Sequence, residues 1–370
     1  MRVAILGLVL LVAACAPRGA MTLDPAARGV GAEQVIFVGT NRLPVAGNVR
    51  FGGGRDETER FRRYTLSVPP DRAPGTLTWP RAGAQPDPRR HFIALDERIY
   101  PDATGFRAGL AEAMRVNRRG QREVVVFVHG FNTNYAEGVY RVAQLAHDLQ
   151  FPGTTVHFSW PSRGDALGYV YDRDSALAAR DRLESLLSEI AAAGADRILI
   201  CAHSMGSALS MEALRQGRLA DRPFMRRVQG VVLMSPDIDV DVFRSQVQAV
   251  GTLPQPILVF SSQRDRALSL SSLIAREPNR LGNLADVGRV ADLDVVLLDV
   301  TAFSTGVGHL TPGSSPRLIA LLNRAQEIDR AFNSDAERRI GLLPGVVLTV
   351  QSATRIIVSP VAGLAESLRD

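Results

Sequence analysis

The chain lacks lysine altogether. Its 43 basic residues are therefore all arginine, and against 38 acidic residues they leave a formal net charge of only +5 over 370 residues. Proteins that hold nucleic acid by electrostatics carry a basic run or a basic face. The arginines here are spread along the whole sequence, so we expect no nucleic-acid partner.

Cysteine is almost absent, with Cys15 and Cys201 as the only two. If Cys15 carries a modification, as argued below, one thiol remains and a structural disulfide within the chain is excluded. Stability must then come from a hydrophobic core. A chain of 370 residues with 46% hydrophobic content is ample for one large core.

Long hydrophobic runs are also scarce. The run near the start, MRVAILGLVLLVAAC at Met1 to Cys15, is too short to span a bilayer as a helix and has the layout of a secretory signal. Its last four residues resemble the lipobox of bacterial lipoproteins, which implies cleavage before Cys15 and acylation of that cysteine. Ala16 stands where an aspartate would mark inner-membrane retention. The resemblance therefore implies an anchor in the outer membrane, facing the periplasm.

Composition divides the chain into four parts. Residues 1–15 form the predicted signal peptide, and residues 16–33, rich in glycine and proline, form a predicted tether. Residues 34–335 form the predicted domain, and residues 336–370 a C-terminal extension. Within it, the segment Gly341 to Leu368 is apolar but interrupted by Pro344, Gln351, Arg355 and Pro360, so it cannot be a spanning helix. It either packs on the domain or lies in a membrane interface as an amphipathic element.

Short apolar runs alternate with helical stretches from Glu123 onward. This alternation predicts parallel strands joined by helical crossovers, an α/β class with a mostly parallel central sheet and helices on both faces. Three strand candidates precede it: Gln34 to Thr40, Tyr64 to Val68 and His91 to Ile99. Later strands are expected at Glu123 to Val128, Thr155 to Ser159, Arg197 to Cys201, Gln229 to Met234, Pro256 to Phe260 and Asp294 to Val300. Helices are expected at Tyr135 to Leu149, Asp174 to Ala193, Met205 to Arg215, Val240 to Val250, Leu268 to Arg276 and Pro316 to Phe332.

The glycine run Gly52 to Gly54 has the composition of a phosphate-binding loop. No apolar strand precedes it and no lysine follows it, so we interpret it as a turn.

The stretch RILICAHSMGSALSMEALR, Arg197 to Arg215, joins a buried strand directly to a helix. So tight a turn exposes its central side chain, Ser204, at the carboxyl end of the strand and beside a helix N-terminus. The pentapeptide Ala202 to Gly206 resembles the nucleophile elbow of the α/β-hydrolase superfamily. Ala202 stands where the motif G-x-S-x-G has its first glycine, and Gly206 keeps the second. A serine capping the helix would be the structural alternative.

This resemblance implies a Ser, Asp, His order along the chain and a base in the loop after the last strand. His309 is the one histidine beyond the last predicted strand, in the loop Thr301 to Ser315. Two acids compete for orienting it. Asp265 follows the strand Pro256 to Phe260, which is the usual position, and Asp237 follows the preceding strand. We favour Asp265.

The oxyanion hole of the superfamily combines two backbone N–H groups. One belongs to the residue after the nucleophile, here Met205. The other comes from the loop that follows the strand Glu123 to Val128, where an HG dipeptide precedes Phe131. The resemblance assigns these roles to Phe131 and Met205.

The HGFN loop, the AHSMG elbow and His309 together resemble a branch of bacterial α/β hydrolases that is esterase-like or lipase-like. The likeness covers about Gln34 to Phe332 and implies a lipid-anchored serine hydrolase that cleaves a small-molecule or lipid carboxylic ester without a cofactor or metal. Two alternatives stay open. One is acyl transfer to an envelope acceptor, and the other is a hydrolase-shaped binding lipoprotein without turnover.

Overall fold

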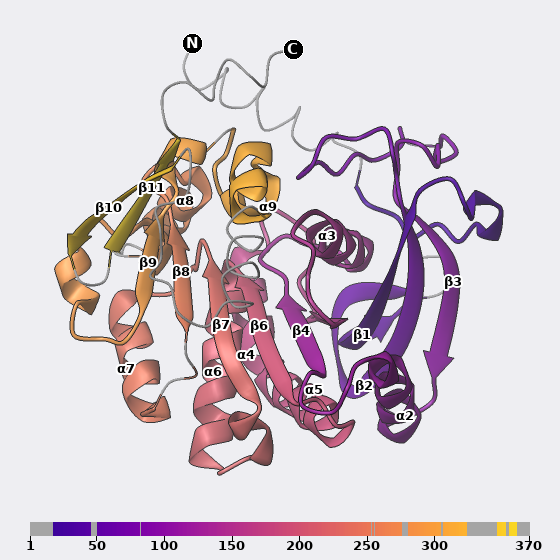
Figure 1. The fold of residues 1–370 in the computed structure, drawn as a ribbon, viewed down its shortest axis with the longest axis horizontal. Coiled ribbons are helices and arrows are strands. Elements are labelled where there is room, and N and C mark those ends of the chain that lie inside the picture. Colours follow the sequence, from indigo (N-terminus) through magenta and orange to yellow (C-terminus); the bar gives the residue numbers. More distant parts are fainter. Residues whose placement is uncertain are drawn as a thin grey trace.

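The protein is built around one mixed β-sheet (Figure 1). The computed structural model describes residues 18–45, 50–81, 83–252, 254, 256–275, 280–304, 306–323, 346–352 and 355–360. These residues form an 11-stranded sheet in the order β10-β11-β9-β8-β7-β6-β4-β5-β1-β2-β3. The strands are β1 (Ala32–Pro44), β2 (Phe51–Val68), β3 (Ile93–Tyr100), β4 (Glu123–Val128), β5 (Thr154–Ser159), β6 (Arg197–His203), β7 (Val228–Met234), β8 (Ile257–Ser261), β9 (Val296–Asp299), β10 (Val346–Ser352) and β11 (Arg355–Pro360).

The centre of the sheet is parallel, from β1 through β5, β4, β6, β7, β8 and β9 to β11. Antiparallel pairs occur at both edges, between β1, β2 and β3 and between β10 and β11. The helices are α2 (Ala103–Ala113), α3 (Tyr135–Asp148), α4 (Tyr169–Ala178), α5 (Arg180–Ala192), α6 (Met205–Leu219), α7 (Val240–Val250), α8 (Arg266–Ala275) and α9 (Thr311–Ser314), followed by a helical stretch at 316–323.

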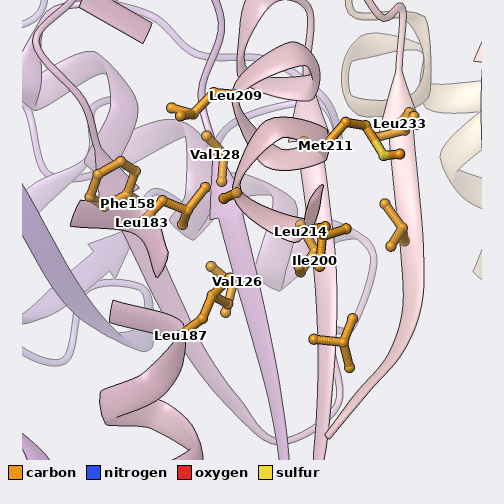
Figure 2. Close-up of a cluster of buried hydrophobic side chains, with 14 of the residues drawn as sticks. Val126, Val128, Phe158, Leu183, Leu187, Ile200, Leu209, Met211, Leu214 and Leu233 are labelled. Atoms are coloured by element: carbon orange, nitrogen blue, oxygen red, sulfur yellow. The ribbon is translucent and has the colours of Figure 1, made fainter. Parts of the chain in front are cut away.

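Strand β4 shows why helices cover both faces. Its residues alternate sides, so Val126 and Val128 pack with α5 and α6 while Val125 and Phe127 pack with α3 on the opposite face. Figure 2 shows Val126, Val128 and Leu187 in the first of these clusters. A strand buried on both faces has to be apolar at successive positions, and the five residues of β4 after Glu123, VVVFV, are all apolar and buried. The predicted α/β class, a mostly parallel central sheet with helices on both faces, is confirmed.

Two predictions about local structure were wrong. The range expected as one helix, Asp174 to Ala193, is occupied by α4 and α5, which meet at Ala179. The glycine run Gly52 to Gly54 lies inside β2 rather than in a turn. A Cβ on Gly53 would lie 2.6 Å from Cα of Arg163, so the strand needs a glycine where another backbone crosses it. Helix α2 was not predicted at all.

In the segment predicted as a tether, the described residues contact the domain. Leu23 forms a parallel bridge with Ala94, Met21 is buried, and β1 already begins at Ala32. The N–H of Gly19 donates to Glu137 at 3.0 Å. From residue 18 onward the segment is therefore packed on the domain; residues 16 and 17 lie outside the described residues.

The predicted extension contributes to the sheet. Strand β11 pairs with β9 in parallel, and β10 pairs with β11. The predicted helix Pro316 to Phe332 is helical at 316–323, and its remainder lies outside the described residues. In the part of the chain that the structure describes, no helix combines the length and the apolar character needed to cross a bilayer.

Helix α6 approaches β4 closely at Gly206. A Cβ placed there would lie 2.3 Å from the carbonyl oxygen of His129 and 2.6 Å from that of Val128. Neither backbone oxygen can move without disturbing the end of the central strand. The second glycine of the elbow therefore sets how near the helix comes to the sheet.

Gly206→Ala should lower the melting temperature by several degrees, because relieving such an overlap typically costs about 1–3 kcal/mol in a packed core. Gly105→Ala is the matched control: a methyl group added to this helical glycine would have no neighbour closer than 3.6 Å, and alanine favours helix by up to about 1 kcal/mol. Thermal melts of both variants test the contrast. Equal melting temperatures would contradict it.

Candidate active site

Ser204 occupies a strained turn between β6 and α6. Its backbone has φ 52° and ψ −123°, a region that costs a non-glycine residue about 1–3 kcal/mol and persists only when the surroundings impose it. The surroundings do so from both sides. The Ser204 N–H donates to the carbonyl of Met234 at 3.0 Å, and the Ser204 carbonyl accepts from Ser207 at 2.9 Å and from Asp237 at 3.3 Å. Ser204 is 2% exposed, so the prediction that the turn exposes its side chain is wrong; the residue is buried, although it lines the pocket described below.

His309 lies in the predicted loop after β9 and contacts Asp265. Its Nδ1 is 2.8 Å from Oδ2 of Asp265, and since a carboxylate only accepts, Nδ1 carries the proton and Nε2 is left as an acceptor. The other oxygen of Asp265 accepts the N–H of Leu268 at 3.0 Å. Asp265 is fully buried, and bonds to both of its oxygens fix its orientation.

Asp237, the competing acid, contacts a different set of side chains. Its Oδ2 accepts from the hydroxyl of Tyr169 at 2.9 Å and its Oδ1 from the hydroxyl of Ser271 at 2.7 Å. The Nε of Arg280 lies 3.4 Å from the same Oδ1. Burial, and then the neighbouring Asp237 charge, raise the pKa of Tyr169 to about 12. Asp237 thus joins α4 to α8, and the acid in contact with His309 is Asp265.

Ser204 and His309 line one small pocket together with Phe131, Tyr169 and Asp237. Its volume is about 80 Å³, and the remaining walls are mostly apolar. Among the described residues no hydrogen bond joins Ser204 to His309. Catalytic hydrogen bonds are often long in ligand-free sites and tighten when substrate binds.

The loop after β4 brings a backbone donor to the same pocket. Phe131 is half-buried and lines it, and Met205 is the first residue of α6, where helical N–H groups have no partner in the helix. Within the described ranges, neither the N–H of Phe131 nor that of Met205 has a hydrogen-bond acceptor. Both are free to receive an anionic oxygen.

Two buried charges that the sequence analysis did not single out hold this loop. Oδ2 of Asp172 accepts the N–H of Asn132 at 3.2 Å and the hydroxyl of Ser162 at 2.5 Å. Arg42 donates to the carbonyl of Thr133 at 2.8 Å and to that of Ser162 at 2.7 Å. Burial lowers the pKa of Arg42 to about 10 and raises that of Asp172, so Arg42 stays charged at neutral pH. No local sequence signal marks either residue, since these partners lie 91 and 120 residues from Arg42 and 40 and 10 residues from Asp172, in other elements or loops.

His203, which precedes the nucleophile candidate, contacts His309 as well. Its Nε2 lies 3.2 Å from the carbonyl oxygen of His309, and the two ring centroids are 4.7 Å apart. Loss of water around the ring, and then the nearby His309, lower the pKa of His203 well below its ordinary value. The neutral ring can donate from Nε2 to that carbonyl and so supports the loop that carries His309.

In the described ranges no three His, Cys, Asp or Glu side chains come together in a way that could hold a metal ion. Cys201 is buried beneath the elbow, and burial raises the pKa of its thiol to about 12. Cys15 lies outside the described residues.

One family model matches this chain, and several solved structures are distantly similar to it. The family model described as "Alpha/beta hydrolase of unknown function (DUF900)" matches residues 106–324. A fungal esterase from Rhizomucor miehei is 12% identical with a TM-score of 0.37, over 85% of this chain and 87% of its own. A thermostable esterase from Pseudomonas putida ECU1011 is 14% identical with a TM-score of 0.37, over 82% and 83%.

Aspergillus fumigatus lipase B is 14% identical with a TM-score of 0.39, over 62% of this chain and 58% of its own. At these values the structural likenesses bear on neither substrate nor mechanism. No curated protein sequence matched the chain. The family match covers more than half of the chain and includes Ser204, Asp265 and His309. The chain therefore belongs to the alpha/beta hydrolases of the DUF900 family.

Proposed function

We propose that this protein is a serine hydrolase that cleaves carboxylic esters through an acyl-enzyme intermediate. The observation that carries the proposal is the pairing of two features in one pocket. A serine sits on a strained strand-to-helix turn, and a histidine bonded to a buried carboxylate faces the same small cavity. A nucleophile, a base and an orienting acid are the parts that acyl transfer through serine requires.

In the first half of the reaction, Oγ of Ser204 attacks the ester carbonyl carbon while its proton passes to Nε2 of His309. The carbonyl oxygen becomes an oxyanion, and the N–H groups of Phe131 and Met205 stabilise it. The tetrahedral intermediate collapses as the bond to the alcohol oxygen breaks. The proton on His309 goes to that oxygen, so a neutral alcohol leaves and Ser204 carries the acyl group.

In the second half, water attacks the acyl carbon and gives its proton to His309. Collapse of the second tetrahedral intermediate releases the carboxylic acid and returns the proton to Oγ of Ser204. Throughout, Asp265 keeps the His309 proton on Nδ1 and stabilises the imidazolium that forms twice in each cycle. No cofactor takes part in these steps.

We propose further that the enzyme is a lipoprotein of the bacterial envelope, attached through acylated Cys15 to the outer membrane and facing the periplasm. The support is the sequence Met1 to Cys15, with its apolar run, its small residues and its cysteine. Two or more acyl chains give stable anchoring, whereas one chain binds only marginally.

Ser204→Ala should lower turnover on p-nitrophenyl butyrate by at least about 10³-fold, because the nucleophile is lost while the rest of the site remains. Labelling by a fluorophosphonate should disappear in parallel, with little change in melting temperature. Ser210→Ala is the control. Its buried hydroxyl bonds the carbonyl of Gly206 one turn into α6, away from the pocket, and the variant should keep activity within about threefold. A Ser204→Ala enzyme that retained most activity would rule out the mechanism.

Asp265→Asn should lower turnover by about 10⁴-fold with a near-normal melt, because asparagine leaves His309 in the wrong tautomer. Asp237→Asn should cost about tenfold or less in turnover but reduce stability, since it weakens hydrogen bonds from Tyr169 and Ser271. The measurements are kcat on one ester and thermal melts for both variants. The reverse ranking of kcat would assign the orienting role to Asp237.

Cys15→Ser should abolish incorporation of a radiolabelled fatty acid into the protein and release it from the membrane fraction, because the acylated thiol is removed. Serine is close to cysteine in size, so the variant tests the loss of the sulfur atom alone. Labelling with fatty acid that persisted in the variant would show that the lipid, if any, is attached elsewhere.

A further inference from the structure

Five large apolar side chains are exposed around the mouth of the pocket that holds Ser204. They are Leu167, Leu270, Leu273, Ile274 and Val307, with exposed fractions of 89%, 59%, 75%, 50% and 58%. We call this group the apolar rim. Single exposed apolar residues are ordinary, whereas a group of them beside a binding site marks an interaction surface.

Helix α8 supplies most of the rim. Leu268 and Ser271 face inward and are buried, while Leu270, Leu273 and Ile274 are exposed. At 100° per residue the exposed three fall within one sector of about 100°. A surface helix normally turns a polar face to water. Arg266 and Ser269 are exposed at the start of α8, but among the described side chains from Leu270 onward the exposed ones are leucine and isoleucine. Leu270 and Ile274 also line the Ser204 pocket, so the rim continues into it.

The remaining two rim residues flank the same opening. The carbonyl of Val307 accepts the N–H of Arg266 at 3.1 Å, which holds the loop before His309 against the start of α8. Leu167 lies between Ala166 and Tyr169, both of which line the pocket. The rim therefore borders the pocket on two sides.

The N-terminal segment meets the domain beside this opening. Arg18 donates to Oδ1 of Asn132 at 2.9 Å and to Oε2 of Glu137 at 2.7 Å. Asn132 directly follows Phe131, which lines the pocket. Two residues, Ala16 and Pro17, lie between Cys15 and Arg18, and the three residue steps of extended chain span at most about 11 Å. An acyl anchor on Cys15 would hold the membrane surface within that distance of the loop.

We propose that the apolar rim inserts into the surface of the membrane to which the chain is anchored, and that the substrate is an ester of a membrane lipid. The ester chemistry rests on the proposed function above. The rim offers apolar surface to the acyl region of a bilayer, where it is stabilised by transfer out of water. The anchor keeps that bilayer at high effective concentration. A substrate acyl chain then passes along Leu270 and Ile274 to reach Ser204.

The test compares two double variants of the full-length, acylated protein in phosphatidylethanolamine and phosphatidylglycerol vesicles. The rim variant combines Leu167→Glu and Leu273→Glu, two rim residues that do not line the pocket. Val116→Glu with Leu219→Glu is the matched control, at exposed fractions of 88% and 64%. Val116 precedes β4 and Leu219 ends α6, so both lie toward the amino ends of the central strands. Each protein is assayed on soluble p-nitrophenyl acetate and on a fluorogenic diacyl phospholipid in the vesicles.

We expect the rim variant to lose at least tenfold on the vesicle ester while keeping its rate on p-nitrophenyl acetate within twofold. The control variant should change neither rate by more than twofold. A rim variant with unaltered vesicle activity would overturn the inference. So would a rim variant that only converts a dimer to a monomer in sedimentation, because the occupant of the rim would then be a second copy of this chain.

A second measurement separates this inference from the proposed function. A fluorophore on Leu273→Cys should be quenched by nitroxide lipids in the bilayer, and one on Leu219→Cys should not; Cys201 is buried and does not compete for label. If wild type hydrolyses neither ester but quenching occurs at residue 273 alone, the ester chemistry fails and the membrane contact stands. Equal quenching at both positions would overturn the membrane contact.

Discussion

The close approach of α6 to the end of β4 is the constraint on which the site depends. Gly206 lets the helix backbone come against the carbonyls of Val128 and His129. That proximity places Met205, the first N–H of α6, opposite the loop that carries Phe131. It also forces the chain to reverse within one residue, which is why Ser204 has a positive φ. The strain is held by backbone hydrogen bonds to β7 and to Asp237, so the sheet rather than the turn itself keeps the geometry.

Buried charge organises the opposite side of the pocket. Arg42 and Asp172 are both buried, and each satisfies its charge with several hydrogen bonds to the loop after β4 and to Ser162. Removing one member of such a network usually costs more than the network contributes, because the partner is left buried and unpaired. The network therefore fixes the position of the Phe131 N–H rather than adding much to stability.

The two carboxylates near His309, Asp265 and Asp237, have different structural roles. The two oxygens of Asp265 accept hydrogen bonds from His309 and from the start of α8. Asp237 accepts hydrogen bonds from the hydroxyl groups of Tyr169 in α4 and Ser271 in α8, and so joins these two helices. Asp237 thereby helps to set the width of the pocket beneath the apolar rim. Asp237 thus lines the pocket and orients two helices, whereas Asp265 is fully buried beside His309 and orients its ring.

The sequence by itself determined the parts that depend on local pattern. Apolar runs of strand length identified the strands β4 to β9, because a strand buried on both faces is mostly apolar; β11, which lies in the predicted extension, was not identified. The strand, turn and helix around Ser204 lie within nineteen consecutive residues, Arg197 to Arg215, so their arrangement was also readable. The positions of His309 and the two acids at strand ends followed from the order of these elements.

Only the tertiary structure decided which acid meets His309. Asp237 and Asp265 follow adjacent strands, β7 and β8, and both can reach one pocket. The loop of His309 returns from β9, which neighbours β8, and this adjacency in space brings Asp265 to the histidine. The burial of Arg42 and the docking of Arg18 could not be predicted from the sequence either. Arg42 contacts the site loop, Ser159 and Ser162, which lie 87 to 120 residues away. Arg18 contacts Asn132 and Glu137, which lie 114 to 119 residues away. Contacts at such separations depend on how the whole sheet closes, and no local pattern encodes that.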